Sequence, residues 1–318
     1  MLGRGVAARL LEDPRRRLVS KDVSDITSTA DAFVLNLECC ISERGSPWPD
    51  PAKPFFFRAP PRATCVLQDL GVSCVTLANN HALDFGEEAL LDTVRYLDEA
   101  GIRHVGAGRD LTQARAPVVL ETRALRIAVL GVTDHPADYA ACSERPGVAF
   151  ADLRRSVPEW LTRWIGAADA DIVLVTPHWG PNMTAEPLAS VRAAARALVD
   201  AGGTLVAGHS AHVFQGVEGR ILYDLGDFLD DYAIEPVLRN DLGLLFLITV
   251  ALSGPVRLEA VPLKLDYCFT SLAEGEDAAW IARRFRDACR PFGTDVRSEQ
   301  GRLIVSWPAQ TTPREGPA

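Results

Sequence analysis

The feature of this sequence that most limits its fold is an alternation of short apolar runs with longer amphipathic stretches. Short apolar runs between turn-forming residues are typical of buried strands, whereas apolar residues that recur every three or four positions are typical of helices. This alternation indicates an α/β protein. We predict strands over residues 32–35, 73–78, 126–131, 171–176, 204–207 and 219–224.

Helices are predicted between these strands. The stretch 87–100 has leucine and valine at helical spacing and is followed by Gly101, a residue that commonly ends helices. The stretch 188–201 has the same design and ends before Gly202. Beyond residue 240, the same criteria predict a strand pair at 244–251 and 256–263, a helix at 277–289 and a last strand at 303–307.

A length of 318 residues is enough for one large domain or two ordinary ones. We predict a main domain over residues 1–265, with residues 266–318 as an appendage that packs on it. The formal net charge of −9 gives no general attraction to a phosphate backbone, so we expect no nucleic-acid partner.

The cellular setting is predicted from the cysteines and from the absence of long apolar runs. The seven cysteines show no CxxC spacing, which favours a reducing compartment. No stretch reaches the roughly eighteen uninterrupted apolar residues of a membrane span. We therefore expect the chain as given to be soluble and cytoplasmic.

Four of the predicted strands end in polar residues of the kinds that bind metals. Ligands bind outside the carboxyl ends of strands in open α/β sheets, so these groups converge if the strands share a sheet system. The groups are Asn36 and Glu38, Asn79 to His81, His178, and His209 with His212.

These segments contain four of the six histidines, together with a carboxylate and amides. Imidazole, carboxylate and carbonyl oxygen without thiolate suit Mn, Fe or Zn better than an iron–sulfur or structural zinc site. A single histidine at a strand end is more often structural than catalytic. Polar groups at four strand ends instead favour a metal centre.

The same segments resemble the CapA family, whose members are linked to poly-γ-glutamate capsule synthesis and belong to the calcineurin-like metallophosphoesterase superfamily. The resemblance covers about residues 1–265 in the family's order. It is carried by Asn36-Leu37-Glu38, Phe57-Arg58-Ala59-Pro60, Leu77-Ala78-Asn79-Asn80-His81-Ala82-Leu83-Asp84-Phe85-Gly86, Gly106-Ala107-Gly108, His178-Trp179-Gly180, Gly208-His209-Ser210-Ala211-His212 and Tyr223-Asp224-Leu225-Gly226-Asp227-Phe228.

The resemblance implies a four-layer α-β-β-α sandwich with a dinuclear metal site at the strand ends. By the family pattern, Glu38 bridges two metals, while Asn80, His178 and His209 hold one of them and His212 holds the other. The expected cofactors are therefore divalent metal ions, Mn, Fe or Zn.

The resemblance also assigns catalytic and substrate-binding roles. His81 is the general acid that protonates the leaving group, and Asp84 orients its ring. From their chemistry, Arg4 and Arg58 are candidates for binding an anionic substrate, since guanidinium groups match carboxylates and phosphates; the alternative for each is a surface role. Asn36 and Asn79 complete the predicted substrate-binding set; for Asn79, which stands where the wider superfamily has glycine, the alternative is a turn residue.

The chain departs from the family pattern at two places. The family has an apolar strand ending in Gly-Asp shortly before the segment that matches Met1, so the first strand and one aspartate ligand are expected to be missing. Because that ligand is expected to be missing, we expect this chain to bind one metal ion rather than two. Asp227 replaces the usual asparagine, and we interpret this as a changed turn rather than an added charge at the site. His104 and His135 are placed outside the site.

The sequence thus predicts a metal-dependent hydrolase that acts on an anionic small molecule or polymer, in poly-γ-glutamate or related polymer synthesis. One alternative is a non-catalytic, metal-poor partner of a membrane synthase in a capsule or envelope assembly. Another is a tailoring hydrolase or amide-forming enzyme of a biosynthetic cluster. Association with a membrane or an export system is expected if an N-terminal segment precedes Met1. The substrate, the metal and the oligomeric state stay open.

Overall fold

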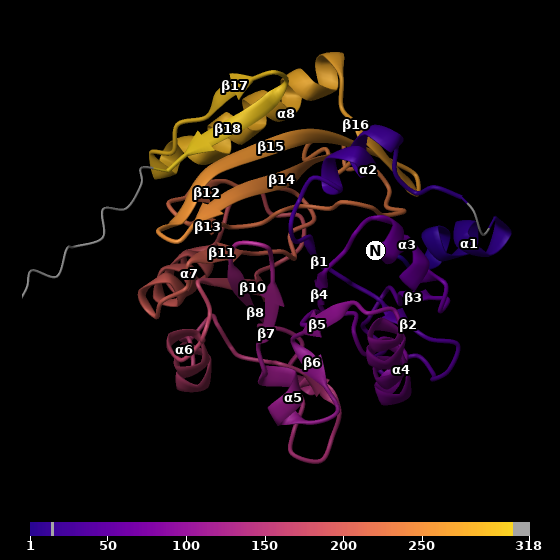
Figure 1. The fold of residues 1–318 in the computed structure, drawn as a ribbon. Coiled ribbons are helices and arrows are strands. Elements are labelled where there is room, and N and C mark those ends of the chain that lie inside the picture. The colour runs from indigo at the N-terminus through magenta and orange to yellow at the C-terminus, as the bar shows by residue number, and fades with distance from the viewer. Residues whose placement is uncertain (14–15, 308–318) are drawn as a thin grey trace, which may run out of the picture.

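The computed structural model of this chain describes residues 1–13 and 16–307 and has four layers (Figure 1). Helix α8 (Gly275–Cys289) forms one outer layer, and a sheet that contains β14 (Leu242–Ala251) and β15 (Gly254–Asp266) lies beneath it. Two further sheets form the next level, and helices that include α4 (Gly86–Glu99) cover their far side. This order confirms the predicted α-β-β-α sandwich.

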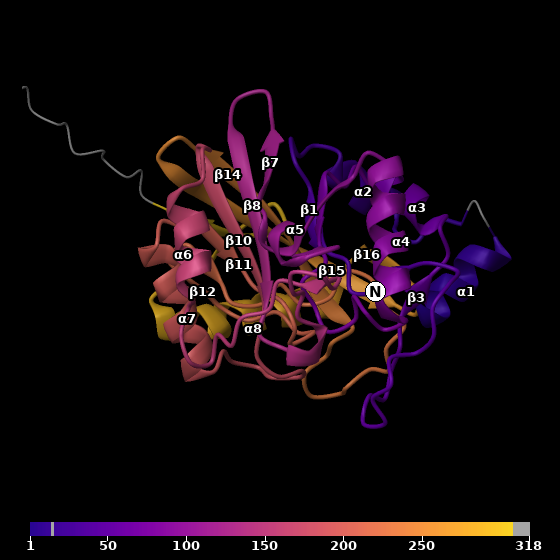
Figure 2. The same cartoon turned by 90° about the horizontal axis from the view of Figure 1, so that it is seen from below.

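The two inner sheets are largely parallel. The smaller has the order β1 (Val34–Asn36), β4 (Cys74–Thr76) and β5 (Arg103–Val105), all parallel. The larger has the order β12 (Val217–Glu218), β13 (Ile221–Leu222), β11 (Leu205–Ala207), β10 (Ile172–His178), β8 (Arg126–Thr133) and β7 (Val118–Glu121). Its four central strands are parallel, and the edge strands β7 and β12 are antiparallel to their neighbours. Figure 2 shows β8, β10 and β11 side by side.

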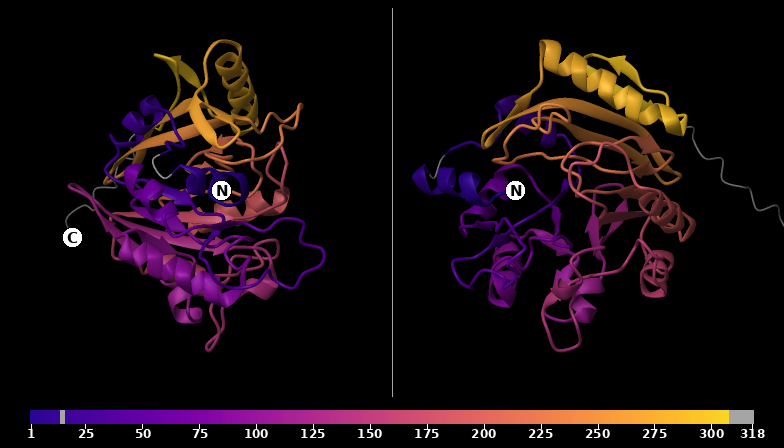
Figure 3. Two further views of the ribbon diagram at one scale, coloured as in Figure 1. Left: turned by 90° about the vertical axis from the view of Figure 1, so that its right-hand side faces the viewer. Right: turned by 180° about the vertical axis from the view of Figure 1, so that it is seen from behind.

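The outer sheet is antiparallel, with β15 pairing to β14, to β18 (Arg302–Ser306) and to β16 (Phe269–Leu272), and with β17 (Arg297–Glu299) at its edge. Alternate residues of β14 and β15 face opposite sides. Leu258 and Ala260 pack with Phe285 of α8, whereas Leu245 and Val261 join the core that surrounds β1 and β4. Figure 3 shows α8 lying across the outer face of this sheet.

The remaining elements are short. The other helices are α1 (Arg4–Glu12), α2 (Lys21–Thr27), α3 (Ala63–Asp69), α5 (Leu111–Arg115), α6 (Glu159–Gly166), α7 (Ala189–Asp200) and the 3-10 turns Ala137–Tyr139 and Arg290–Phe292. Two strand pairs lie apart from the main sheets: β2 (Cys40–Ile41) with β3 (Arg58–Ala59), and β6 (Ala107–Gly108) with β9 (Gly147–Val148). Among the described residues, no helix is both long enough and apolar enough to cross a bilayer.

Every element predicted from the sequence is present, with ends that shift by a few residues. The largest difference is at 219–224, where only Ile221–Leu222 is a strand, because Gly219 adopts a φ of 54° and turns the chain back onto β12. The predicted appendage begins at Asp266, the last residue of β15. Its β16 and β18 pair directly with β15, while residues 308–318 lie outside the described residues. The division at residue 265 stays a prediction.

Candidate metal centre

The candidate site lies where parallel strands of the two inner sheets end. β10 ends at His178, and its neighbour β11 ends two residues before His209. In the smaller sheet, β1 ends at Asn36, and β4 ends three residues before Asn79. The carboxyl ends of parallel strands meet at one edge of a sheet, so each sheet brings its predicted residues together there.

His178 and His209 form the centre of the larger half of the site. The β10–β11 pairing continues as a bridge between these two residues, and their Nδ1 atoms lie 2.8 Å apart. The Nε2 atom of His209 contacts Thr176 Oγ1 at 3.0 Å, which holds the ring in place. Gly208, next to His209, lets the chain pass close to Tyr223, because a Cβ there would lie 2.3 Å from the carbonyl oxygen of Tyr223.

Both rings are neutral in this environment. Burial, reinforced by the neighbouring imidazoles of His212 and His135, lowers the pKa of His209 to about 3. Burial also lowers the pKa of His178 well below its usual range, with His209 as the next cause. Neutral imidazole is the form that binds metals.

His212 contacts a carboxylate that the sequence interpretation placed elsewhere. Its Nδ1 lies 3.0 Å from Asp227 Oδ1, so the interpretation of Asp227 as a mere change of turn is wrong. Burial opposes the protonation of His212, but the charges of Asp227, Glu38 and Asp224 outweigh it and raise the pKa of His212 to about 10. His212 also has a φ of 59°, in a left-handed region that residues other than glycine rarely adopt.

In the smaller half of the site, His81 is held by Asp84. The Nδ1 atom of His81 lies 2.7 Å from Asp84 Oδ2, within a turn after β4. The other carboxylate oxygen, Oδ1, contacts Lys53 Nζ at 3.0 Å and accepts a hydrogen bond from the Tyr139 hydroxyl at 3.3 Å. The lysine also donates to the carbonyl oxygen of Asn80 at 2.6 Å. The buried Asp84 carboxylate therefore has a cationic partner as well as the imidazole.

The amides beside His81 form a second network. Asn36 donates to Glu38 Oε2 at 2.8 Å, and Asn79 donates to Asn36 Oδ1 and to the Leu37 carbonyl, both at 2.9 Å. The Oδ1 atom of Asn79 accepts a hydrogen bond from the backbone N–H of His81 at 3.0 Å. Asn36 and Asn79 thus hold protein groups in place, and their predicted contact with substrate stays a prediction.

Aromatic contacts and electrostatics connect the two halves. The Phe57 ring lies 4.6 Å from that of His81 and 6.1 Å from that of Tyr232, which in turn lies 5.2 Å from His212. The charge of Glu38 raises the pKa of His212, and the charge of His81 contributes to lowering that of His178. The strand-end groups of both inner sheets therefore form one site.

The two predicted anion-binding arginines are engaged with protein groups. Arg4 forms an ion pair with Asp231 at 3.2 Å. The Arg58 guanidinium lies 4.1 Å from the centre of the Phe85 ring and donates to the Arg44 carbonyl oxygen at 3.3 Å. Their role in substrate binding stays a prediction.

Sequence reasoning missed several groups at the site. His135, placed outside it, has its ring 5.0 Å from that of His178, which corrects that interpretation. Lys53 and Tyr139 were not considered either. His135 follows the strand that was predicted at 126–131, so its position one strand over from His178 was a signal that could have been used. Lys53 comes from a loop without periodicity, and nothing in the sequence pointed to it.

The donors present fit a divalent metal ion. Among the described residues no three His, Cys, Asp or Glu side chains are preassembled around one point, but the site offers imidazole pairs with amide and carboxylate oxygens nearby. Buried atoms without a hydrogen-bond partner include Glu38 Oε1, Asn80 Oδ1, His178 Nε2 and Asp227 Oδ2. Such atoms are costly unless something binds them.

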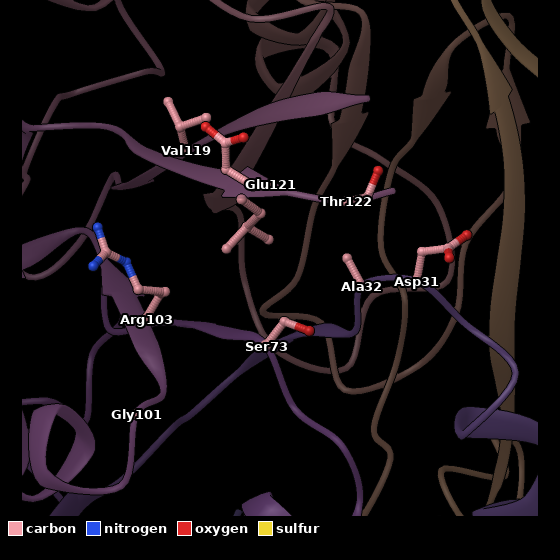
Figure 4. Close-up of a pocket in the computed structure, with 9 residues that line it drawn as sticks. Asp31, Ala32, Ser73, Gly101, Arg103, Val119, Glu121 and Thr122 are labelled. Carbon is pink, nitrogen blue, oxygen red and sulfur yellow. The ribbon is translucent and has the colours of Figure 1, made fainter. Parts of the chain in front are cut away.

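A separate cavity of about 430 Å³ opens at the opposite edge of the sheets (Figure 4). Asp31, Ser73 and Arg103 line it from the amino ends of β1, β4 and β5, and Glu121 lines it from β7. None of the described residues around it is a histidine. The chemistry of the strand ends, rather than the size of this cavity, locates the candidate site.

The four layers and the histidine-rich strand ends define an α-β-β-α sandwich protein with a candidate metal centre at its strand ends. A family model described as "Bacterial capsule synthesis protein PGA_cap" matches residues 1–232, and the chain belongs to this family.

The chain is also similar to individual proteins. A probable polyglutamine synthesis accessory protein of Mycobacterium tuberculosis is 33% identical over 300 residues, which cover 89% of this chain and 78% of that protein. The capsule biosynthesis protein CapA of Bacillus anthracis is 34% identical over 176 residues, covering 52% of this chain and 42% of the relative. A solved structure of a novel phosphatase from Mycoplasma pneumoniae covers 79% of this chain and 85% of its own, with 14% identity and a TM-score of 0.40.

Proposed function

We propose that this protein is a metal-dependent hydrolase that acts on an anionic substrate during the synthesis of poly-γ-glutamate or a related polymer. The observation that carries the proposal is the His81–Asp84 pair at 2.7 Å, in the same site as the neutral imidazoles of His178 and His209. Family membership supports the polymer, because the relatives are named for capsule and polyglutamine synthesis.

The residues have separate tasks in this proposal. Glu38, Asn80, His178, His209 and His212 would hold divalent metal, which supplies Lewis-acid polarisation of the substrate and activation of water. The Asp84 carboxylate accepts the Nδ1 proton of His81 and leaves Nε2 directed at the substrate. In its protonated form, the Nε2 atom gives its proton to the departing oxygen or nitrogen.

The test combines metal analysis with turnover. Purified protein loaded with Mn²⁺ or Zn²⁺ is assayed for bound metal, for hydrolysis of bis(p-nitrophenyl) phosphate and for cleavage of poly-γ-glutamate. We expect His81→Ala to retain its metal while kcat falls by a factor on the order of 10²–10⁴, the usual contribution of a positioned general acid. Loss of metal together with activity would assign His81 to the ligands instead.

His104→Ala is the matched control. His104 lies in β5 and pairs with Asp98 of α4 at 3.3 Å, so its loss should change neither metal content nor turnover.

A non-catalytic role is the second candidate, because the Mycobacterium tuberculosis relative is named an accessory protein. In that case the wild-type chain binds metal poorly, hydrolyses neither substrate, and co-purifies with components of a membrane synthase.

A further inference from the structure

His135 lies beside His178 of the candidate metal centre because of the register between β8 and β10. Thr133, the last residue of β8, is the register partner of His178, and His135 follows two residues later. The ring centroids of His135 and His178 are 5.0 Å apart with an interplanar angle of 44°. The side chain of His135 is 34% exposed, so it reaches the solvent side of a centre whose other imidazoles are buried.

Asp134 orients the His135 ring. Its Oδ1 contacts His135 Nδ1, while its Oδ2 accepts a hydrogen bond from the Gly180 backbone N–H at 3.3 Å. The backbone N–H of Asp134 also donates to the His178 carbonyl oxygen at 3.0 Å. The Asp134–His135 pair is therefore attached to the backbone at His178 and at Gly180, and its position follows that of β10.

The Asp134 carboxylate beside His135 Nδ1 determines which ring nitrogen of His135 can bind a metal. The proton stays on Nδ1, next to Asp134, and Nε2 presents its lone pair. Histidines that bind metals almost always donate their second ring N–H to a carboxylate, a carbonyl or water in this way. No hydrogen bond joins His135 Nε2 to another residue in the described part of the chain, and the Nε2 atom of His178 is buried without a partner.

The ring separation is also small enough for one ion. With centroids 5.0 Å apart, both imidazoles could reach a single divalent ion lying between them. Two imidazoles that only packed against each other would need neither the carboxylate on His135 Nδ1 nor the unpartnered Nε2 atom of His178.

We propose that His135 is a further ligand of the metal centre, binding through Nε2 the same divalent ion as His178. The inference rests on the proposed metal-dependent function and adds a ligand to it. Asp134 is then a positioning residue, which acts on the ion only through the imidazole that it orients.

The test measures metal affinity without reference to activity. Metal-free wild-type protein, His135→Ala and Asp134→Asn are titrated with Zn²⁺ by calorimetry in competition with a chelator of known affinity. We expect His135→Ala to bind at least tenfold more weakly. Asp134→Asn keeps the shape of the side chain and should lose a factor of about 10–100, the usual effect of removing a partner that orients a ligand. His104→Ala, the control, should match wild type, and circular dichroism checks that each variant is folded.

A second readout identifies the ligand itself. In the Co²⁺-loaded protein, an imidazole bound through Nε2 shows a paramagnetically shifted Nδ1–H proton resonance, and His135→Ala should lack one such signal. Unchanged zinc affinity and an unchanged set of signals in His135→Ala would overturn the inference while leaving the proposed function standing. A wild-type chain that binds neither Zn²⁺ nor Co²⁺ would overturn both.

Discussion

Asp84 is a buried carboxylate on which four groups converge, one of them the Tyr139 hydroxyl on Oδ1. His81 Nδ1 and the Phe57 backbone N–H both contact Oδ2, at 2.7 and 2.6 Å, and Lys53 Nζ contacts Oδ1 at 3.0 Å. The lysine side chain is itself only 12% exposed, so this ion pair is shielded from water. Removing one partner of such a pair leaves the other charge buried without compensation.

We therefore expect Lys53→Met to act on stability and on turnover together. The free energy of unfolding, measured in urea, should fall by about 1–3 kcal/mol, as for other buried polar groups that lose a partner. The kcat for a phosphodiester substrate should fall while KM changes little, because Asp84 then holds His81 less firmly.

Lys264→Met is the matched control for Lys53. Its Nζ contacts Asp277 at 2.7 Å, but the lysine side chain is 40% exposed. Exposed pairs contribute about 0–1 kcal/mol, so this variant should unfold almost like wild type and keep its kcat. Equal effects of the two substitutions would contradict the assigned role of Lys53.

The Arg44–Asp92 pair predicts a pH dependence that is separate from the site. Asp92 is buried and accepts hydrogen bonds from Arg44 Nε and Nη2 at 2.9 and 2.7 Å and from Ser42 at 2.7 Å. The hydrogen bond to Arg44 is the main cause that lowers the pKa of Asp92. A depressed pKa in the folded state stabilises the fold above the ordinary aspartate pKa of about 3.9, and this contribution is lost as the pH falls towards the folded value.

Asp92→Asn should accordingly be less stable than wild type by about 1–2 kcal/mol at pH 7, a figure reduced for the exposure of Arg44. The difference in unfolding free energy should narrow as the pH falls from about 5 to 3. Urea unfolding at a series of pH values measures it, and a constant difference would show that Asp92 acts through packing alone.

The division of the histidines between metals gives another prediction. His209→Ala should remove more metal, measured as metal per chain after dialysis, because His209 shares the imidazole pair with His178. His212→Ala should remove less, since the His212 ring is paired with Asp227 and is not part of the imidazole pair of His178 and His209. Equal losses would argue that all three histidines serve one ion.

The site residues that could be predicted from the sequence are those that follow strands directly. His178 and His209 come at or just after strand ends, and the apolar runs before them marked those ends. Asp227 and Lys53 lie in loops, and they meet His212 and Asp84 only because distant segments fold over one another. Such contacts depend on tertiary packing, which local patterns do not encode.

At the scale of elements, α8 closes the outer sheet. The Phe285 ring is fully buried and packs against those of Phe214 and Phe246, with centroids 6.2 and 6.1 Å apart. The helix was predicted at 277–289 from its spacing and spans Gly275–Cys289. Its contact with the sheet could not be predicted, because a helical pattern shows which face is apolar but not what covers it.

Phe285→Ala should lower the unfolding free energy by about 3–5 kcal/mol, the usual cost of emptying a large aromatic site in a core. Leu252→Ala, at the exposed turn between β14 and β15, is the control and should change it by less than about 0.5 kcal/mol. A small effect of Phe285→Ala on the transition of the whole chain would mean that α8 unfolds as a separate unit.

At the scale of the whole molecule, β15 joins the parts that the sequence analysis divided. One face of this strand packs on the core around β1 and β4, and the other packs on α8, while β16 and β18 extend its sheet. The sequence predicts residues 266–318 as an appendage that packs on the main domain, but a local pattern does not show that its strands join the same sheet.

Backbone hydrogen bonds between β10 and the segment after β11 continue as far as the two histidines of the candidate metal centre. The amide of His209 donates to the Pro177 carbonyl oxygen, and the amide of Trp179 donates to that of His209, both at 3.0 Å. The two histidines can separate only when these backbone hydrogen bonds open. The rate of deuterium uptake at the His209 and Trp179 amides thus measures how often the edge of the sheet opens locally. An ion held between the rings should slow this exchange at both amides.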